Sequence, residues 1–512
     1  MATLLFLGAS VSQLPAIRYA AAAGHRVVAI DGDPAAIGLQ HADVGVAVDF
    51  TDVEAVVTAG REHAVDGVLA ISSDRAVVPA AEVAAALVLP GIGAGVARAM
   101  TDKPTMRAGL ERAGVPQPRY AVLTATSDVP AASSLVPLPA VLKPADSGGQ
   151  RGLFMIRAPD DVAAHLDEAL TFSTTKRAML EEYIDGIELN GILVVRDGEP
   201  TLITLSDRLR PGGLGFGVGW IHSFPSSLPA STIDRARDVA FAAVRALGLR
   251  NGIAFPQLIA DGDDVRVVEI AARIAAGQMA DLVRFGTGVE LFDIAIAQAL
   301  GRPVSDEQLR PKAARPIAIR FLTARPGALP LGKVRSIEGI DEVRASPGVL
   351  AAGLYFGAGA TITPLHVDAD RRGYVVATAE SPQAALALAD AAAGKLVVRT
   401  MRRIPGGLSR RFVGPTAVAA VVAVAAGLVL VLSHSGIRPR LISETIHTRG
   451  GRLDVRYVFN EPVRALLLVD NKPATAFSSL RRAGDLVLMR GTHTMLAIEV
   501  VDSAGNRLTV TL

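Results

Sequence analysis

The stretch Val141–Leu153, VLKPADSGGQRGL, organises the rest of the sequence. An apolar run ends in Lys143, a proline follows, and small, glycine-rich residues continue to Gly152. A lysine supplies a point charge for a phosphate, and glycines let backbone N–H groups close over an anion without obstructing side chains. It is not a Walker A loop, because there the lysine comes last. Alone, the stretch predicts either a phosphate-binding loop or an ordinary turn.

Length and composition limit what the whole chain can be. With 512 residues it exceeds one ordinary domain, and we expect three or more. The formal net charge of +2 gives no argument for nucleic acid as a partner. The absence of cysteine from the sequence excludes disulfides and thiolate metal sites. The start, MATLLFLGAS, has no basic region and predicts a buried strand rather than a signal peptide.

Before the glycine-rich stretch, short apolar segments alternate with a helical pattern. We predict a parallel sheet with right-handed crossovers, built from strands Thr3–Leu7, Arg26–Ile30 and Gly67–Ile71 and helix Gln13–Ala23. The dinucleotide fingerprint after Gly8 is incomplete, which favours a scaffold over a cofactor site here. Asp74 follows the third strand, at the sheet edge where ligands gather, and is a candidate for a substrate contact.

Two charged motifs flank the glycine-rich stretch. Lys103 precedes a helical pattern, so it is either a solvated residue at a helix start or a second phosphate lysine. Downstream, Met179–Asn190, MLEEYIDGIELN, mixes apolar and acidic residues around a glycine. This segment fits a strand edge that binds a purine through its backbone and a ribose through a carboxylate. It also fits an ordinary hairpin with exposed acids.

A hairpin pattern follows in Asn251–Gly277, NGIAFPQLIADGDDVRVVEIAARIAAG. Strands Gly252–Ala260 and Val265–Ile270 flank a turn of acidic residues and glycine. Gln257 and Glu269 can point to one face, and two such oxygen ligands suit Mg²⁺, which takes carboxylates together with phosphate oxygens. Arg273, four residues after Glu269, could hold a phosphate through two hydrogen bonds.

The motifs KPADSGGQRG, EEYIDGIE and VVEIAARIAAG follow Lys103 in one order and at sensible spacing. Together they resemble the ATP-grasp superfamily of carboxylate ligases, in its amino-acid-ligase-like and carbamoyl-phosphate-synthase-like branch. The phrases SSDRAV, TDKPTMR, AGVPQP and DRRGYV are of the same type. The resemblance implies an α/β (α+β) ATP-grasp fold with an N-terminal Rossmann-like pre-ATP-grasp domain. The implied ranges are 1–100 for that domain, 101–310 for the ATP-grasp domain and 311–400 for a C-terminal subdomain.

The resemblance also implies ATP and Mg²⁺, or Mn²⁺, as cofactors, and a set of residues that contact them. Lys103 and Lys143 would contact the ATP phosphates, beneath a flexible loop, Ser147–Gly152. The cofactor-binding loop residues are Ser147, Gly148, Gly149 and Gly152. Around the nucleoside, Glu188 would take the ribose hydroxyls, and the adenine pocket would be lined by Glu181, Glu182 and Ile184, the last two through their backbone.

The metal and catalytic residues are implied in the same way. Gln257 and Glu269 would bind Mg²⁺, and Arg273 would stabilise the transferred phosphoryl group or an acyl phosphate. The family often has Asn where this chain has Ala271, and more commonly Glu where it has Gln257, so a single carboxylate remains. Two functions therefore stay open. One is an ADP-forming carbon–nitrogen ligase, and the other is a degenerate nucleotide-binding module that senses or scaffolds.

For the ligase, the implied route has two steps. A substrate carboxylate attacks the γ-phosphate of ATP to give an acyl phosphate, and an amine then displaces phosphate. Lys143, Arg208 and Arg273 are the candidate catalytic residues. His222, near Arg208 in sequence, is either part of the acceptor site or a packed histidine. The partners expected are small-molecule carboxylates and amines, and a homodimer is also considered.

The C-terminal part of the sequence predicts a membrane anchor and an outer domain. After a basic linker, 401–413, the run Gly414–Leu432 is uncharged and long enough to span a bilayer; we place the helix at 414–433. Six basic residues precede it and two follow, which places the catalytic part in the cytoplasm and the tail outside the cell membrane. Residues 440–512 predict a small, weakly immunoglobulin-like all-β sandwich, with strands including Leu453–Phe459 and Ala465–Val469, for which an extracytoplasmic ligand is considered.

Overall fold

A computed structural model describes residues 1–210, 217–324 and 327–401, together with the backbone of strands between residues 441 and 511. The chain divides into two compact units, of which the first comprises Met1–Arg210 and Gly217–Met401. The predicted linker, apart from Met401, and the predicted membrane segment 414–433 lie outside the described residues. Among the helices that are described, none combines the length and the apolar character needed to cross a bilayer.

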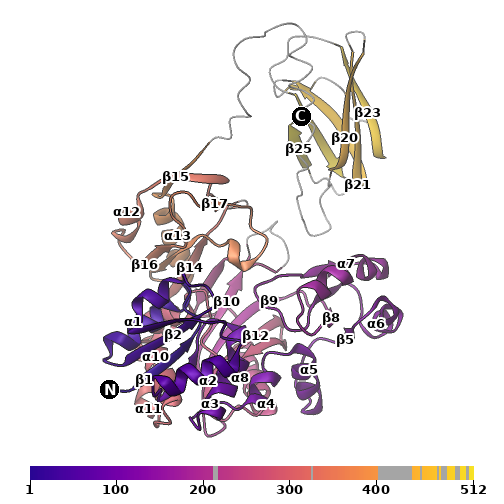
Figure 1. Cartoon of the computed structure of the whole chain (residues 1–512). Coiled ribbons are helices and arrows are strands. Elements are labelled where there is room, and N and C mark those ends of the chain that lie inside the picture. Colours follow the sequence, from indigo (N-terminus) through magenta and orange to yellow (C-terminus); the bar gives the residue numbers. More distant parts are fainter. Residues whose placement is uncertain are drawn as a thin grey trace. The chain divides into compact units, whose positions relative to one another are not determined.

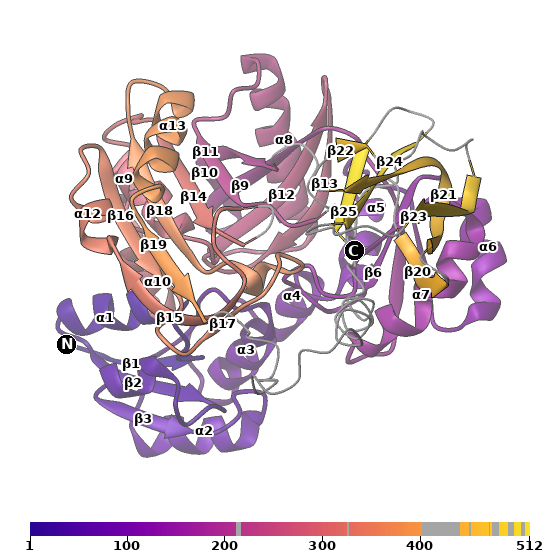
Figure 2. The same ribbon diagram turned by 90° about the horizontal axis from the view of Figure 1, so that it is seen from above.

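The N-terminal region is a four-stranded parallel sheet in the order β3-β2-β1-β4, which confirms the predicted parallel sheet. Leu5, Leu7, Val28 and Ile30 are fully buried in its core, as expected for strands that are covered on both faces. Figure 2 shows α1 and α2 on opposite faces of this sheet. The elements are β1 (Thr3–Leu7), α1 (Leu14–Ala22), β2 (Arg26–Asp31), β3 (Val44–Ala47), α2 (Val53–Glu62), β4 (Gly67–Ala70), α3 (Val77–Ala86) and α4 (Ala94–Ala99).

A second, smaller sheet carries the glycine-rich stretch at the end of one of its strands. Its four antiparallel strands have the order β5-β8-β6-β7, and two helices, α6 and α7, pack against them (Figure 1). Helix α5 begins at Lys103, where the side chain of Asp102 caps it by accepting a hydrogen bond from Thr105 N. The elements are α5 (Lys103–Arg112), β5 (Tyr120–Leu123), α6 (Val129–Leu135), β6 (Ala140–Pro144), β7 (Phe154–Ile156), α7 (Pro159–Thr171) and β8 (Ala178–Glu182).

The largest sheet has eight strands in the order β13-β12-β9-β10-β11-β14-β18-β16. Helix α8 packs on it through an apolar stripe that includes Ala236, Val239, Ala240 and Ala243. The hairpin predicted in 251–277 is confirmed as β12 and β13, with Gln257 opposite Glu269. The elements are β9 (Ile187–Arg196), β10 (Glu199–Leu209), β11 (Ile221–Phe224), α8 (Ala230–Ala246), β12 (Gly252–Asp261), β13 (Asp264–Ala271), α9 (Met279–Thr287), α10 (Leu291–Ala299) and α11 (Asp306–Leu309).

The last part of the first unit extends the large sheet and adds a three-stranded sheet, β17-β15-β19. The alanine-rich helix α13 packs against β14 and β18, and it begins one residue before the predicted segment Gln383–Ala393. The elements are β14 (Ile317–Leu322), β15 (Gly332–Glu338), α12 (Ile340–Arg344), β16 (Val349–Leu354), β17 (Thr361–Ile362), β18 (Gly373–Thr378), α13 (Pro382–Ala393) and β19 (Val397–Thr400).

The second unit contains a six-stranded antiparallel sheet. The two strands predicted at Leu453–Phe459 and Ala465–Val469 are one long strand, β21, with a register irregularity between Val458 and Val463. Strand β20 was not predicted. The β content is thus present, while the packing of two sheets into a sandwich stays a prediction. The elements are β20 (Leu441–Arg449), β21 (Arg452–Val469), β22 (Lys472–Pro473), β23 (Arg481–Met489), β24 (Leu496–Asp502) and β25 (Arg507–Thr511).

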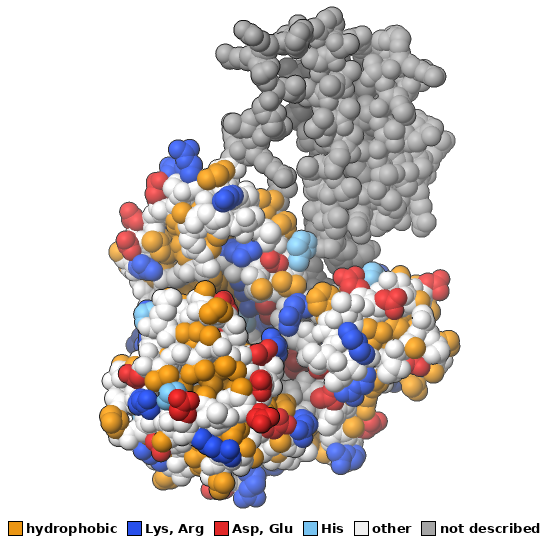
Figure 3. Space-filling model, in the orientation of Figure 1, with side chains coloured by type: hydrophobic (Ala, Val, Ile, Leu, Met, Phe, Trp, Pro, Cys, Tyr) orange, Lys and Arg blue, Asp and Glu red, His pale blue; other side chains and the backbone are white. Residues whose placement is uncertain are grey.

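The N-terminal sheet joins the large sheet directly beyond β4 and β13. Ile71 forms an isolated parallel bridge with Ile274, and Ser72 N donates to Ile274 O at 3.0 Å. The residues that follow β4 therefore lie beside those that follow β13. In the space-filling view of Figure 3, the surface is hollowed between the lobes, and charged side chains line the hollow.

Candidate functional site

Two buried lysines from different parts of the chain meet near the glycine-rich stretch. Lys103 is the first residue of α5, and Lys143 lies near the end of β6; their exposed fractions are 5% and 6%. The Lys103 ammonium lies 3.2 Å from Oε1 of Glu269 and donates to the Ser147 carbonyl at 2.9 Å. The Lys143 ammonium lies 2.6 Å from Oε2 of Glu181. Both lysines are therefore fixed by carboxylates rather than solvated.

Glu181 on β8 is the anionic centre of this group. Arg107 on α5 donates to both of its carboxylate oxygens at 3.0 Å, and Arg107 is itself only 1% exposed. Burial alone would raise the pKa of Glu181, but Arg107 and Lys143 together lower that pKa to about 2. Arg107 also donates to the carbonyls of Val267 and Val268, and so ties β13 to the smaller sheet. We call Lys103, Arg107, Lys143, Glu181 and Glu269 the lysine cluster.

The two lysines differ in how their charge is supported. Burial lowers the pKa of both ammonium groups. For Lys103, the carboxylates of Glu269, Asp74 and Glu181 outweigh burial, and its pKa is raised. For Lys143, burial prevails, assisted by Arg107 and Lys103, and its pKa is lowered despite Glu181. An additional anion near Lys143 would therefore offset the burial that opposes its charge.

Oxygen-bearing side chains lie in register across three neighbouring strands. Asn190 on β9 is opposite Gln257 on β12, and Gln257 is opposite Glu269 on β13. Gln257 Nε2 donates to Asn190 Oδ1 at 3.4 Å, which leaves the Gln257 Oε1 oxygen for another partner. Among the described residues, no group of three or more His, Cys, Asp or Glu could hold a metal ion. One carboxylate and one amide oxygen fit a Mg²⁺ whose other ligands are phosphate oxygens and water.

Arg273 lies two residues beyond β13 and is held by the N-terminal sheet. It donates to both carboxylate oxygens of Asp74, from Nε at 2.7 Å and from Nη2 at 2.9 Å. Burial opposes its charge, yet Asp74 and Glu269 raise the pKa of Arg273. Asp74 therefore reaches the site, as its position after the third predicted strand suggested, but its partner is an arginine of the chain itself.

The glycine-rich loop Ser147–Gly152 passes over these groups. Gly149 and Gly152 have φ values of +72° and +66°, which favour glycine. A Cβ atom at Gly148 would lie 3.0 Å from Oδ2 of Asp74, so only a residue without a side chain fits there easily. Asp368 N, from the segment before β18, donates to the Gly149 carbonyl at 3.2 Å. The loop is thus held by groups from both ends of the first unit.

A second group of buried cations lies on β10, β11 and the segment before β18. Arg208 is opposite His222 in the β10–β11 register, and Arg371 donates to the Gly219 carbonyl. The Arg371 guanidinium lies over the Phe321 ring, 4.4 Å from its centroid, and the His222 ring forms a T-shaped pair with the same phenyl ring, with centroids 5.6 Å apart. We call Arg208, His222 and Arg371 the arginine–histidine cluster.

Charge is poorly supported in this second cluster. Burial, followed by Arg371 and Arg208, lowers the pKa of His222 well below its ordinary value, so the ring is neutral near pH 7. Burial, together with Arg208, also lowers the pKa of Arg371 despite Asp368 at 2.8 Å, and the Arg371 Nε atom is buried without a hydrogen-bond partner. The arrangement would be stabilised by an added anion.

A polar chain leads from the arginine–histidine cluster to Gln257, which lies opposite Glu269 in the strand register. His222 Nδ1 lies 3.0 Å from Asn190 Nδ2, and Asn190 in turn accepts from Gln257. Because the amide nitrogen of Asn190 must donate, Nδ1 of His222 accepts and its proton resides on Nε2. A Cβ atom at Gly277 would lie 3.7 Å from that Nε2 atom and 3.8 Å from Nη1 of Arg371, so the segment beyond Arg273 also reaches the second cluster.

Most of the predicted site residues therefore lie in one region, with differences in detail. Lys103, Lys143, Glu269 and the loop are brought together as expected, and Arg208 and His222 are neighbours. Glu188 is half-buried and forms ion pairs with Arg208 and Arg210. The remaining predicted nucleotide contacts are Glu182, which pairs with Arg266, and Ile184, which lies between β8 and β9.

Several residues of the site were not predicted. Arg107 and Asn190 lie at the ends of the quoted segments TDKPTMR and MLEEYIDGIELN, but no role was assigned to them, and Phe321 looks like an ordinary strand residue. Arg371 was visible as a basic turn before a strand, although nothing in the sequence paired it with Arg208. These contacts join residues that are 30 to more than 150 positions apart, which local patterns do not report.

Two known protein families match consecutive parts of the first unit. Residues 102–307 match a family model described as the ATP binding domain of the carbamoyl-phosphate synthase L chain. Residues 320–401 match a model described as L-amino acid ligase C-terminal domain 2. The chain is 30% identical over 264 residues to a D-alanine–D-alanine ligase of Desulforudis audaxviator, which covers 48% of this chain and 77% of that protein.

Other relatives share the fold at lower identity or in part. An uncharacterized protein, y4rH, of Sinorhizobium fredii is 31% identical over 290 residues, which cover 56% of this chain but only 58% of that relative. The crystal structure of an L-amino acid ligase from Bacillus licheniformis matches with a TM-score of 0.67 and 20% identity, over 78% of this chain and 99% of that one. A biotin carboxylase domain from Hydrogenobacter thermophilus, solved with MgADP, matches with a TM-score of 0.63 and 17% identity, over 78% and 90%.

Proposed function

The chain belongs to the ATP-grasp superfamily of ligases, which bind ATP and Mg²⁺, and from this premise we propose that it joins a small carboxylic acid to a small amine with the release of ADP. The observation that carries the proposal is the meeting of Lys103, Lys143 and Glu269 beneath the glycine-rich loop. Cations, a metal-ligating carboxylate and a closable loop are the parts that phosphoryl transfer requires.

In this proposal, the lysine cluster binds the phosphates. The ammonium groups of Lys103 and Lys143 lie close enough to Glu269 and Glu181 to be positioned before ATP arrives, which reduces the cost of ordering them. Glu269, with the free amide oxygen of Gln257, would hold one Mg²⁺, which when bound neutralises charge on the phosphate oxygens. An amide at position 257 and an alanine at position 271 leave a single carboxylate, which favours one metal ion over two.

The reaction would proceed through two displacements. An oxygen of the substrate carboxylate attacks the γ-phosphorus of ATP, and ADP leaves with the electrons of the broken P–O bond. The amine nitrogen then attacks the acyl carbon, phosphate leaves, and the amine loses a proton. Arg273 can stabilise the transferred phosphoryl group once it releases Asp74, and the closed loop would keep water from hydrolysing the acyl phosphate.

The arginine–histidine cluster is the proposed position of the substrate carboxylate. Arg371 has a buried Nε without a partner, and Arg208 faces His222 across the strands. A neutral His222 can donate a hydrogen bond from Nε2 without adding charge. Catalytic roles are proposed for Arg273, Lys143 and Arg208. A sensor or scaffold role is less well supported, because each ionic contact of the lysine cluster is intact.

Substrate-dependent release of ADP tests this function. Purified full chain with MgATP is screened against carboxylates and amines, and we expect ADP to form only when an acceptable pair is present. Oxygen-18 in the substrate carboxylate should then appear in the released phosphate, because the acyl phosphate transfers that oxygen. Unlabelled phosphate during confirmed ligation would refute the acyl-phosphate route. ATP binding without any dependence on added substrates would instead favour the sensor role.

We also propose, from sequence alone, that the uncharged run 414–432 anchors the chain in a membrane with the ligase part in the cytoplasm. The chain has no cysteine, so single cysteines can be introduced at Ser134 and Ser479 and tagged with an impermeant maleimide. Ser479→Cys should be labelled once any outer envelope barrier is opened, and Ser134→Cys only after lysis. Recovery of the unlabelled protein in the soluble fraction would refute the anchor.

A further inference from the structure

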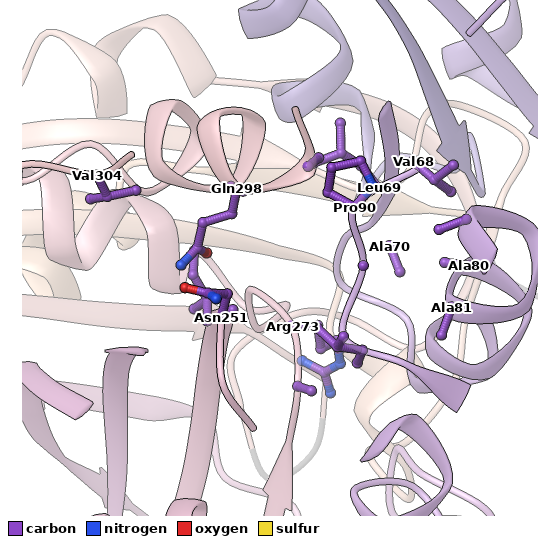
Figure 4. A pocket seen from close by; sticks show the side chains of 18 of the residues that line it. Val68, Leu69, Ala70, Ala80, Ala81, Pro90, Asn251, Arg273, Gln298 and Val304 are labelled. Atoms are coloured by element: carbon purple, nitrogen blue, oxygen red, sulfur yellow. The ribbon is translucent and has the colours of Figure 1, made fainter. Parts of the chain in front are cut away.

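A cavity of about 700 Å³ opens where the N-terminal sheet meets the large sheet. Its walls come from β4, α3 and the segment 90–92 on one side, and from the β9–β10 turn, the start of β12 and the end of α10 on the other (Figure 4). A cavity of this volume accommodates a small organic molecule. Of the residues given a role in the function proposed above, only Arg273 lines it.

The cavity is separate from the lysine cluster. On β12 it is lined by Gly252 and Ile253, whereas Gln257 lies four to five residues further along that strand. At the rise of an extended strand, this interval corresponds to roughly 15 Å. Arg273 is common to both regions, because its side chain lines the cavity and its guanidinium reaches Asp74.

One side of the cavity is aliphatic. Ala80 and Ala81 of α3 line it together with Val68 and Leu69 of β4 and with Pro90, and Figure 4 shows these side chains around the opening. None of the described residues that line the cavity is aromatic. Small and branched aliphatic side chains leave room for an aliphatic ligand. They offer no flat face on which a purine or another aromatic ring would stack.

The opposite side is polar and carries one cation and one anion that are little used. Arg302 is exposed and, within the described part of the chain, its guanidinium makes no hydrogen bond or ion pair. The Asp197 carboxylate receives only a 3.5 Å hydrogen bond, from Asn251 Nδ2. The other charged groups at this rim are engaged, since Arg196 pairs with Asp306 and Glu199 with Arg245.

We propose that this cavity is a regulatory site for a zwitterion with an aliphatic body, of the size of a short aliphatic peptide. The ammonium group would meet Asp197, the carboxylate would meet Arg302, and the aliphatic side chains would fill the space beside α3 and β4. A zwitterion satisfies both charges at once, while a simple carboxylate or amine satisfies one.

The site is regulatory because its wall includes the segment that sets Arg273. Ala272, Arg273 and Ile274 line the cavity, and Ile274 accepts the hydrogen bond from Ser72 N that joins the two sheets. A ligand packed between α3 and this segment favours the arrangement in which Asp74 holds Arg273. Because Arg273 must leave Asp74 to reach a phosphoryl group, an occupied cavity slows ADP release.

L-leucyl-L-leucine is the probe, titrated calorimetrically into the full chain and added to the ADP-release assay. Ala81→Leu places a larger side chain in the cavity and should abolish binding of the probe. Ala85→Leu is the matched control, because Ala85 is exposed on the same helix and does not line the cavity. It should bind the probe as the wild type does.

The charged rim supplies a second test that does not depend on repacking α3. Arg302→Gln should weaken binding of leucyl-leucine by about tenfold, the scale of one charge-assisted hydrogen bond. The probe with its carboxylate amidated should bind the wild type more weakly by a similar factor and be insensitive to Arg302→Gln. For the ammonium group, Asp197→Asn should weaken binding by a similar factor, and the N-acetylated probe should bind weakly and be insensitive to Asp197→Asn.

Three results would overturn the proposal. Absence of saturable binding of leucyl-leucine to the wild type would remove the site. Equal binding to Ala81→Leu and the wild type would place the probe elsewhere, including the arginine–histidine cluster. Saturable binding with unchanged ADP release would contradict the regulatory coupling.

Discussion

The lysine cluster and the arginine–histidine cluster are both buried and both cationic, but they differ in how their charges are matched. In the lysine cluster, Glu181 receives Arg107 through two hydrogen bonds and Lys143 at 2.6 Å. In the arginine–histidine cluster, neighbouring cations act on one another, and the pKa values of His222 and Arg371 are lowered. Arg208 and Arg371 do pair with Glu188 and Asp368, but the Arg371 Nε atom has no hydrogen-bond partner, so the second cluster would gain more from an added anion than the first.

This difference indicates which residues hold the fold together and which await a ligand. A buried cation with a carboxylate partner contributes to the folded state, and removal of that partner leaves an uncompensated charge. A buried cation beside another cation is a cost to the folded state, which the binding of an anion would offset. We expect removal of the Glu181 carboxylate to reduce stability, and removal of the Arg371 guanidinium to act mainly on the binding of an anion.

The largest effect should follow Glu181→Gln. The change leaves Arg107 and Lys143 buried without a carboxylate, and we expect a loss of about 3–5 kcal/mol in the free energy of unfolding at pH 7. This loss is measured by unfolding the protein in urea and following a signal from the first unit. Glu182→Gln is the control, since its partner Arg266 is partly exposed and the loss should stay below about 1 kcal/mol. Equal losses would show that burial of Glu181 does not matter.

The same variant has a defined dependence on pH. Because the folded-state pKa of Glu181 is about 2, below its ordinary 4.5, its stabilising effect is complete above about pH 4.5 and is lost as pH falls toward 2. The difference in unfolding free energy between wild type and Glu181→Gln should therefore shrink across that interval. A constant difference would contradict the lowered pKa.

The next effect concerns turnover. Lys143→Met removes a phosphate cation whose pKa burial already lowers, and kcat/KM for ATP should fall by about 10²–10³-fold. The loss is measured as the rate of ADP release with a substrate pair that the screen has identified. Lys333→Met, at an exposed lysine of β15, should leave turnover unchanged. Near wild-type turnover in Lys143→Met would remove this lysine from the proposed mechanism.

A smaller effect tests the neutral histidine. The folded-state pKa of His222 lies well below 6.5, so on acidification the unfolded chain binds a proton that the folded chain refuses. Stability should therefore fall as pH drops below about 6.5, the ordinary pKa of histidine. His222→Gln should remove that part of the pH dependence, measured by urea unfolding between pH 7.5 and 5.5. An unchanged slope would contradict the lowered pKa of His222 in the folded state.

The smallest effect is expected for an exposed ion pair, which serves as a reference for the buried charges of both clusters. Glu307 and Arg310 form a pair at 3.5 Å with side chains about 70% exposed. Glu307→Gln should change the unfolding free energy by less than about 0.5 kcal/mol, and less still in high salt, because water screens the pair. A loss comparable to that of Glu181→Gln would undermine the distinction between buried and exposed charges.

The sequence by itself determined the local elements and the general location of the site. Strand β1 lies at Thr3–Leu7 as predicted, and the β12–β13 hairpin pairs Gln257 with Glu269, because alternation of apolar residues and turn composition act over a few residues. The order of the motifs was enough to bring Lys103, Lys143 and Glu269 into one hypothesis. The predicted membrane segment 414–433 lies outside the described residues, so that prediction still rests on composition.

Only the tertiary structure decided how the charges are paired. Asp74 and Arg273 are 199 residues apart, and Arg107 meets Glu181 across 74 residues, so their contacts depend on how sheets and helices pack. Arg371 gained a role only when the segment before β18 reached Gly219, which precedes β11, and the Phe321 ring. Burial and neighbouring charge together set the sign of each pKa shift, because both are properties of the folded interior and of no short stretch of sequence.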